Sequence, residues 1–130
     1  MITINDYSDM NPKMLSPLTL AFLGDSVFEI LVREKIILKG NAPVNKLHQN
    51  TIKYVSAVSQ SKSVESLLLL LTDEEMTIYK RGRNANTNVP KSASPSEYHR
   101  ATGLETLFGY LYLKNQTDRI LELFSVIWES

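Results

Sequence analysis

The sequence contains no cysteine in its 130 residues. This absence excludes disulfide bonds, zinc sites built on thiolates and thiol nucleophiles, and it fits a reducing cytoplasm. Long apolar runs are also missing, because the longest, Leu67 to Leu71, is far shorter than the roughly 18 apolar residues of a membrane span. Residues 1–6 have neither the basic region nor the long apolar region of a secretory signal. We therefore expect a cytoplasmic protein with no membrane partner.

The short motifs of several enzyme classes are absent as well. The chain has no glycine-rich phosphate loop, no GxSxG and no HExxH. Neither of its histidines, His48 and His99, has an aspartate beside it, so an HD-type phosphohydrolase site is missing. We expect each histidine at a helix surface or partly buried, and not as a catalytic base.

The chain has no net charge, because 14 basic and 14 acidic residues cancel. A zero balance argues against a dedicated nucleic-acid binder, but the charges are unevenly placed. Within residues 80–100 five basic residues accompany one acid, Glu97, and within residues 33–62 six basic residues accompany Glu34. Charge segregated in this way can form a basic face on a neutral protein. A solvated helix face is the alternative for each cluster.

Helix-capping signals divide the chain into roughly six segments, a number that suits one domain over residues 1–130. Ser16 before Pro17 and Thr72 before Glu75 mark helix starts, and Gly40 marks a stop. The predicted helices run from 17 toward 39, from 43 through 52, from 56 through 71, from 72 to about 83, from 95 to about 114 and from 117 to about 128. Residues 84–94 are predicted as a loop. Because no convincing strand is present, the expected fold is all-α. Candidate core residues are Met14, Leu15, the run Leu67 to Leu71 and Trp128.

Asp25 stands directly after Gly24 inside the apolar stretch Leu20-Ala21-Phe22-Leu23-Gly24-Asp25-Ser26. A carboxylate buried in such a helix is unfavourable unless it is paired, hydrogen-bonded or bound to a metal. A glycine–aspartate pair among large apolar side chains has little structural purpose. Asp25 is therefore the first candidate for chemistry.

Glu105 is the only charge in a second apolar stretch, residues 101–113. Gly103 and Gly109 lie in the same predicted helix, although a glycine there destabilises a helix by about 1 kcal/mol relative to alanine. Glycine is tolerated in a helix where another backbone must come close. Gly24 has the same property in the first helix.

We therefore predict that the two helices cross at their small residues, Gly24 and Ser26 against residues 101–103. Such a crossing would bring Asp25 and Glu105 together in one apolar pocket, where their repulsion raises at least one pKa. A divalent cation removes that repulsion, and oxygen-only ligands favour Mg²⁺ or Mn²⁺ over zinc. A purely structural buried pair is the alternative.

Glu29 lies four residues after Asp25, on the same helix face, and is a candidate for an additional ligand or for a neighbour that orients one. The alternative is a surface ion pair with Arg33, which follows Glu29 by four residues.

Two motifs resemble the catalytic domain of the ribonuclease III family: residues 20–26 and Gly103-Leu104-Glu105-Thr106-Leu107-Phe108-Gly109. Residues 55–60, 80–85 and 98–113 resemble its Mini-ribonuclease III branch, which lacks a double-stranded-RNA-binding domain. The resemblance extends from about Leu18 to Trp128, and we expect no RNA-binding domain after Ser130.

This resemblance implies an all-α endonuclease, usually a homodimer, that cleaves double-stranded RNA with Mg²⁺. It assigns the metal ligands to Asp25 and Glu105, with an activated water attacking the phosphodiester. For the Mini branch the implied substrate is precursor 23S ribosomal RNA, and a ribosomal protein helper is left open.

The sequence departs from the broader family at Leu18, Ala21 and Thr102, where that family carries further acids. Fewer carboxylates imply weaker metal binding and one ion per site, with Thr102 reduced to a neighbour of the ligands. The main alternative is a catalytically silent relative that binds ribosomal RNA as a structural component. A helical interaction module, with its acids paired to lysine or arginine, is a third.

With no appended RNA-binding domain, the catalytic domain itself must hold the duplex through phosphate contacts and shape. The cluster at the end of the fourth predicted helix and in the following loop fits this role. Its members are Lys80, Arg81, Arg83, Asn84 and Lys91. A solvated basic helix end is the alternative.

Overall fold

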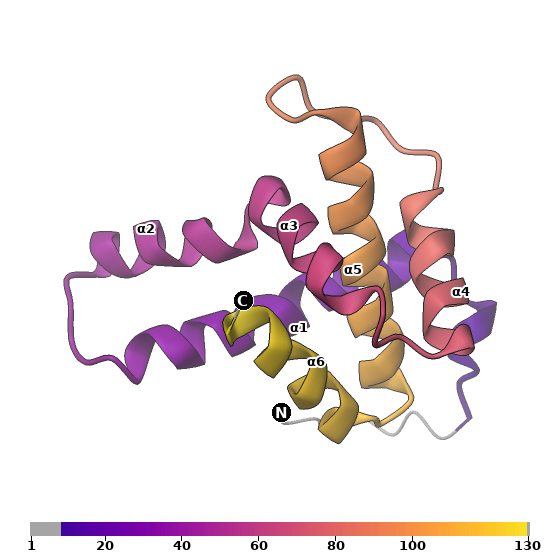
Figure 1. The fold of residues 1–130 in the computed structure, drawn as a ribbon, viewed down its shortest axis with the longest axis horizontal. Helices are drawn as coiled ribbons and strands as arrows, with labels where there is room; N and C mark the ends of the chain where they lie inside the picture. Colours follow the sequence, from indigo (N-terminus) through magenta and orange to yellow (C-terminus); the bar gives the residue numbers. More distant parts are fainter. Residues whose placement is uncertain (1–8, 130) are drawn as a thin grey trace.

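The computed structural model describes residues 9–129, and these residues form the all-α fold that the sequence predicts. A short 3₁₀ helix, η1 (Pro12–Met14), precedes six α-helices (Figure 1). These are α1 (Pro17–Ile37), α2 (Val44–Val55), α3 (Ala57–Leu67), α4 (Asp73–Arg83), α5 (Pro95–Leu113) and α6 (Thr117–Glu129). The segment 1–6, in which we predicted no secretory signal, lies outside the described residues. Within 9–129, no helix is both long enough and apolar enough to cross a membrane.

Side chains at the helix starts explain these boundaries. The Ser16 hydroxyl accepts a hydrogen bond from the Thr19 amide at 3.2 Å, which caps α1. Thr72 and Glu75 form a complete capping box at the start of α4. Thr117, the predicted start of the last helix, is the first residue of α6.

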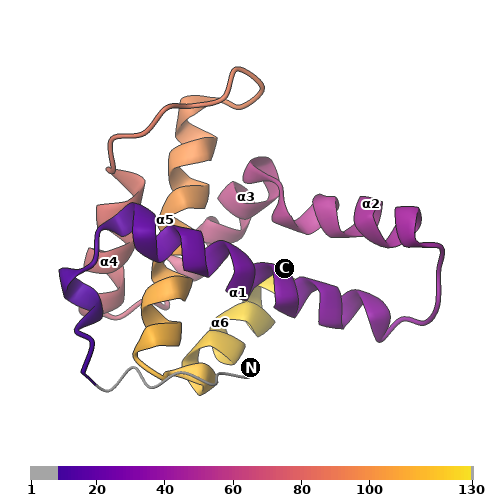
Figure 2. The ribbon, with the colours of Figure 1, turned by 180° about the vertical axis from the view of Figure 1, so that it is seen from behind.

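Helix α5 is the centre of the fold, with α1, α3, α4 and α6 packed around it (Figure 1 and Figure 2). Phe28 of α1 packs edge-on against Phe108 of α5 and Phe124 of α6, at centroid distances of 5.6 and 5.7 Å. The second half of α1 extends beyond this core together with α2, as an arm of two antiparallel helices. Residues on α5 can therefore meet residues from four other helices.

The crossing of α1 and α5 lies at Gly24 and Gly109. A Cβ on Gly24 would lie 1.7 Å from the Glu105 carbonyl oxygen, and a Cβ on Gly109 would lie 2.0 Å from the Leu20 carbonyl oxygen. The two backbones are thus in direct contact, which only glycine permits at these positions. The prediction that α1 crosses α5 at residues 101–103 is wrong, although the predicted pair of helices is right.

Gly103 packs against α4 instead. A Cβ on Gly103 would lie 2.7 Å from the Tyr79 ring, and a Cβ on Gly82 of α4 would lie 2.2 Å from the Thr106 hydroxyl. Gly103 and Gly109 are six residues apart, which is about 120° around an α-helix. They therefore face different neighbouring helices, a fact that residue type alone does not reveal.

Three of the predicted core residues are exposed. Met14 is 81%, Leu69 99% and Leu70 47% exposed. The expectation is wrong for the leucine run because α3 has already ended, and residues 68–70 form a turn toward the α4 cap. Leu15 and Trp128 are partly buried against the core, as expected.

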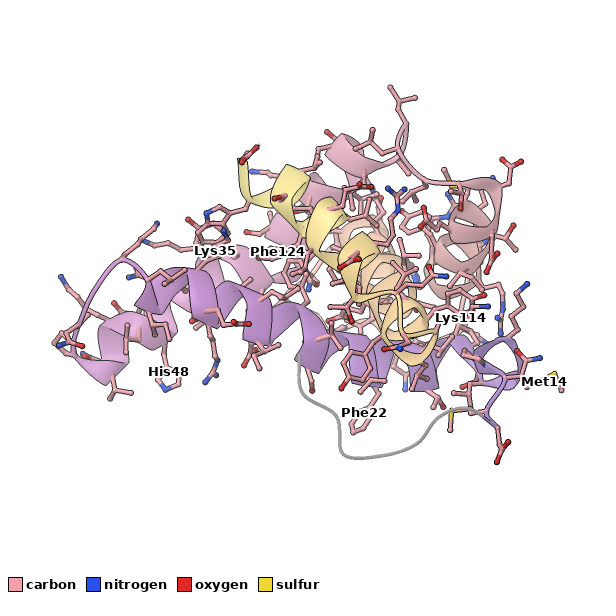
Figure 3. All side chains as sticks on the ribbon, turned by 90° about the horizontal axis from the view of Figure 1, so that it is seen from below. Met14, Phe22, Lys35, His48, Lys114 and Phe124 are labelled. Carbon is pink, nitrogen blue, oxygen red and sulfur yellow. The ribbon has the colours of Figure 1, made fainter. Side chains whose placement is uncertain are left out.

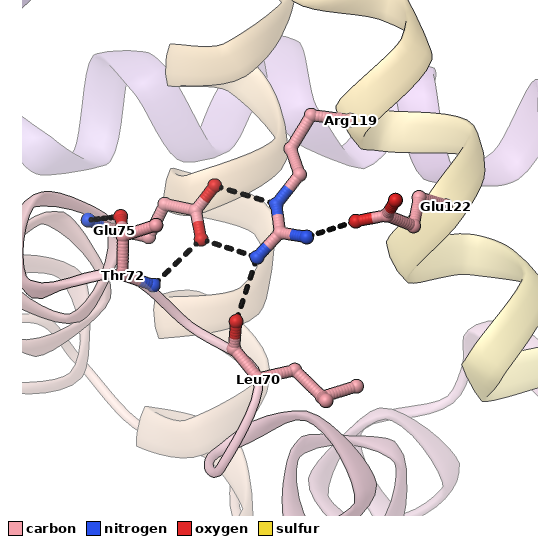
Figure 4. A network of polar contacts seen from close by, with 5 residues as sticks. All are labelled: Leu70, Thr72, Glu75, Arg119 and Glu122. Carbon is pink, nitrogen blue, oxygen red and sulfur yellow. Dashed lines mark hydrogen bonds and ion pairs between the residues drawn. The ribbon is translucent and has the colours of Figure 1, made fainter.

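A network of charges joins α4 to α6 (Figure 4). The Arg119 guanidinium donates to both oxygens of Glu75 at 2.8 Å and to the Leu70 carbonyl at 2.7 Å, and it also pairs with Glu122. Burial alone would raise the pKa of Glu75, but hydrogen bonds from Arg119 and from the Thr72 amide outweigh it and lower that pKa. This buried acid is thus neutralised by a cation of the protein.

Candidate functional site

The two candidate carboxylates, Asp25 on α1 and Glu105 on α5, lie within hydrogen-bonding reach of each other. They are 80 positions apart in the sequence. Gly24 explains their approach, because its α-carbon packs directly onto the Glu105 backbone. The spacing of the pair therefore depends on a backbone contact, and not on flexible side chains.

The environment of Glu105 favours its protonated form. Burial, which is the largest cause, acts with the hydrogen bond and the charge of Asp25 to raise the pKa of Glu105 from 4.5 to about 8. This pKa favours the protonated Glu105 carboxyl at neutral pH, and the proton reduces the repulsion between Glu105 and Asp25. A cation bound between the two oxygens would take the place of that proton.

Asp25 is exposed and Glu105 is half-buried, so the expectation of one apolar pocket around both is wrong. The reason is that α1 buries only part of its apolar stretch. Phe22, one turn before Asp25, is 84% exposed, and Ser26 is exposed as well. The pair thus lies at the edge of the core, where a hydrated ion and a large substrate can reach it.

The donor set of this site consists of two carboxylates. Among residues 9–129, no group of three or more His, Cys, Asp or Glu side chains could hold a metal ion. Mg²⁺ commonly binds through one or two carboxylates and keeps several of its waters. The pair fits such an ion, because its oxygens are hard ligands and its open side leaves space for water.

The two predicted neighbours of the ligands have other partners. Glu29 forms an ion pair with Arg33 at 2.8 Å, which is the alternative that their spacing offered. The Thr102 hydroxyl donates to the Tyr98 carbonyl of its own helix at 3.0 Å. Neither side chain therefore has a role at the carboxylate pair in this structure.

Gln60 of α3 is the residue at this site that the sequence pattern did not single out. Its side chain is only 2% exposed and lies beside the Glu105 carboxyl, where it opposes the rise in the pKa of that group. A signal was present, because Gln60, Val64 and Leu67 share the buried face of α3 at the spacing i, i+4, i+7. A polar residue in such a row occupies a core position.

Four of the five predicted RNA-contacting residues lie at the end of α4 and in the loop that follows. Lys80, Asn84 and Lys91 are exposed. The Arg83 guanidinium lies 5.8 Å from the centre of the Tyr79 ring and donates to the Asn84 side chain at 3.2 Å. We call these four predicted residues the basic loop. It lies at the N-terminal end of α5 (Figure 1).

Arg81, the fifth predicted residue, has a different position. Its guanidinium donates to the Leu15 carbonyl at 3.0 Å, which ties the end of η1 to α4. Arg81 is also half-buried, whereas its neighbour Lys80 is exposed. Its contact supports the fold and not the basic loop.

The fold is that of a known protein family. The Ribonuclease III domain family matches residues 18–116 of the chain. A Mini-ribonuclease 3 of Thermoanaerobacter sp. is 49% identical over 113 residues, which cover 84% of this chain and 80% of that protein. A Mini-ribonuclease 3 of Staphylococcus aureus is 41% identical over 127 residues, which cover 95% of each chain.

A solved structure agrees with these sequence similarities. A crystal structure of a Fusobacterium nucleatum protein superposes with a TM-score of 0.82 and 30% sequence identity, and the match covers 98% of both chains. The chain belongs to the ribonuclease III family, and within it to the Mini-ribonuclease 3 branch.

Proposed function

We propose that this protein is a Mg²⁺-dependent endoribonuclease that cleaves double-stranded RNA. The observation that carries the proposal is the Asp25–Glu105 pair, two carboxylates held together at the surface by a backbone contact. Family membership supports the class of reaction. The pair supports the metal, because like charges that share a site require a proton or a cation between them. Mn²⁺ can use the same oxygen ligands.

In this proposal Asp25 and Glu105 would hold the ion, which when bound would activate a water and stabilise the leaving oxygen of the phosphodiester. Glu105 would take part in holding it as the deprotonated carboxylate. Asp25, being exposed, faces the incoming RNA. Gly24 and Gly109 keep α1 and α5 in contact, so that the two carboxylates stay paired while the RNA binds.

The basic loop is the part of the proposed RNA surface that binds phosphates. Its exposed lysines, Lys80 and Lys91, supply charge, and Asn84 supplies an amide. Glu105 follows Pro95 by ten residues on α5, which is about 15 Å along the helix axis. A duplex that contacts the loop could therefore extend across the carboxylate pair, and its affinity would fall steeply with salt.

The homodimer of the proposal uses the exposed apolar side chains of η1 and the first half of α1. Met14 is 81%, Leu18 39% and Phe22 84% exposed. Figure 3 shows the Phe22 side chain extending away from the body of the protein. Large apolar side chains exposed near one another are typical of an interface. Because Phe22 precedes Asp25 by three residues, a second copy on this face would lie beside the carboxylate pair.

The substrate of the proposal is precursor 23S ribosomal RNA in the cytoplasm, and a ribosomal protein helper remains open. The support for this finer statement is the resemblance to the Mini branch. Shape recognition of a duplex through phosphates and 2′-hydroxyls would not by itself select one RNA.

The decisive experiment is a cleavage assay with Mg²⁺ on a transcript that carries the paired ends of precursor 23S RNA. Asp25→Asn and Glu105→Gln should reduce cleavage by about a thousandfold or more, because each removes a metal ligand. Both should remain folded, since Gln closely mimics the protonated Glu105. Glu29→Gln is the matched control, because it removes a carboxylate of the same helix that is paired with Arg33. It should cleave like the wild type.

Two results would contradict the proposal. RNA binding by the wild type without cleavage in Mg²⁺ or Mn²⁺ would favour a silent RNA-binding relative, a reading consistent with the missing acids at Leu18, Ala21 and Thr102. Absence of any divalent-metal binding and of RNA binding would favour a helical interaction module.

A further inference from the structure

We infer that Gln60 is a positioning residue for Glu105: its amide nitrogen donates a hydrogen bond that fixes the orientation of the Glu105 carboxylate toward a bound cation. This inference rests on the proposed function. It adds a residue from a third helix, α3, to a site otherwise built on α1 and α5.

The first observation is an unused donor in the core. Gln60 is 2% exposed, yet its Nε2 has no hydrogen bond of ordinary geometry. Among the described residues only one other buried side-chain atom, His99 Nδ1, shares this condition. An unsatisfied buried amide destabilises a fold, so each such group calls for an explanation.

The second observation concerns the hydrogen bonds of nearby polar side chains. The Ser63 hydroxyl donates to the Ser59 carbonyl at 3.0 Å, and the buried Thr106 hydroxyl donates to the Thr102 carbonyl at 2.7 Å. Both hydroxyls thus have hydrogen-bond partners, and that of Thr106 also lies 3.1 Å from the Pro17 carbonyl of α1. The amide nitrogen of Gln60 differs from them in having no such partner.

The third observation is what Gln60 faces. Its side chain lies beside the Glu105 carboxyl, at the same site as Asp25. A carboxylate that binds a cation with one oxygen keeps acceptor sites on the other oxygen. An amide N–H can occupy one of these sites, and such outer hydrogen bonds commonly orient metal ligands. A side chain of similar size without an amide, such as methionine, would fill the same space.

A different role would require the Gln60 amide to have the opposite orientation, with its oxygen and nitrogen exchanged. If its oxygen faced the site, Gln60 would be a third ligand of the ion and not a donor to Glu105. The two roles predict opposite effects of Gln60→Glu, which keeps the shape and replaces the donor with an oxygen. If position 60 supplies a third ligand, the new carboxylate would strengthen metal binding. If position 60 supplies a donor, the loss of that donor would weaken metal binding.

The test compares Gln60→Met and Gln60→Glu with the wild type in two measurements that do not depend on cleavage. These are the unfolding temperature without metal and the Mn²⁺ dissociation constant by calorimetry. Gln60→Met should unfold at the wild-type temperature or above it, because an unsatisfied amide is removed. Its Mn²⁺ binding should weaken by about tenfold or more. Gln60→Glu should also weaken Mn²⁺ binding.

Val64→Ala is the matched control for burial, since Val64 lies one turn further on the same face of α3 and is 2% exposed. It should lower the unfolding temperature and leave Mn²⁺ affinity unchanged. The inference is overturned if Gln60→Met behaves like this control, if it changes neither measurement, or if Gln60→Glu tightens Mn²⁺ binding.

Asp25→Asn separates this inference from the proposed function. If Asp25→Asn abolishes Mn²⁺ binding while Gln60→Met leaves it intact, only the role of Gln60 is refuted. If the wild type binds no Mn²⁺ at all, both the proposed function and the role of Gln60 are refuted.

Discussion

Two carboxylates at the edge of this core have opposite surroundings. Glu75, at the junction of α4 and α6, accepts hydrogen bonds from the Arg119 guanidinium, and its pKa is lowered. Glu105, at the crossing of α1 and α5, faces another carboxylate, Asp25, and its pKa is raised to about 8. The first arrangement neutralises a charge within the fold. The second pairs two acids, whose repulsion a proton or a cation from solution can relieve.

The difference shows how to separate structural from functional acids in such a protein. An acid whose counter-charge is supplied by the same chain adds to stability and has no need of a ligand. An acid that faces a second acid lowers the stability of the metal-free protein. A functional role therefore explains its presence better than a structural role does. Each of the following changes disturbs one side of this contrast.

The largest effect is expected from Gly24→Ala. Its new methyl group would lie 1.7 Å from the Glu105 carbonyl oxygen, so α1 and α5 must separate. We expect a loss of about 3 kcal/mol or more of unfolding free energy, measured by urea denaturation. Ser26→Ala, on an exposed position of the same turn, should change stability by less than about 0.5 kcal/mol. Equal stabilities for the two variants would refute the direct backbone contact.

Breaking the structural pair should have the next largest effect. Arg119→Met leaves Glu75 buried without its cation, which typically lowers stability by about 3–5 kcal/mol for a fully buried pair and less here, where Arg119 remains partly exposed. Thermal unfolding at pH 7 measures the change. The double variant with Glu75→Gln should recover much of the loss, because no charge is left unpaired. If the double variant lost as much stability as the two single variants combined, the pairing would be unimportant.

The smallest effect is a pH dependence that differs between the two acids. The pKa of Glu105 is raised from 4.5 to about 8, so the folded state holds a proton that the unfolded state loses. The metal-free protein should therefore lose stability as the pH rises from about 5 to 8, by a few degrees in Tm once solvent screening of the half-buried carboxyl is allowed for. Glu75 acts with the opposite sign. Because its pKa is lowered in the folded protein, its contribution to stability is lost only when the pH falls below the ordinary pKa of a glutamate carboxyl.

Two changes should act on the loss at higher pH. Asp25→Asn takes away the repelling charge and should reduce the loss, although burial still raises the pKa of Glu105. Glu105→Gln removes the titrating group and should abolish the contribution of Glu105. Differential scanning calorimetry at pH 5.5 and pH 8.5 makes both comparisons. A decline in Tm that persists unchanged in Glu105→Gln would come from other groups, and Glu105 would not be its source.

The helices were predictable from the sequence because their limits depend on local chemistry. Ser16 caps α1 and the Thr72–Glu75 box begins α4 through contacts within three residues, which a sequence displays directly. The Asp25–Glu105 pairing was also predictable, because the glycines marked the two helices that meet. The exact crossing was not, since it depends on the rotation of α5 about its own axis.

Contacts between residues that are distant in the sequence could not be predicted from it. Arg81 bonds to the Leu15 carbonyl across 66 positions, and nothing near Arg81 distinguishes it from Lys80. Both belong to one basic cluster in the sequence, but the helix turns them by about 100° relative to each other. The tertiary fold, and not residue type, decides which of them remains exposed.

The Gly24–Gly109 contact also limits how this protein can diverge. The approach of the two helices that carry the carboxylates is set by main-chain atoms, which side-chain substitutions elsewhere do not replace. The basic loop, with its exposed Lys80 and Lys91, has no such restriction. Under the proposed function, descendants of this chain could therefore change the RNA that they bind while the crossing of α1 and α5 stays constant.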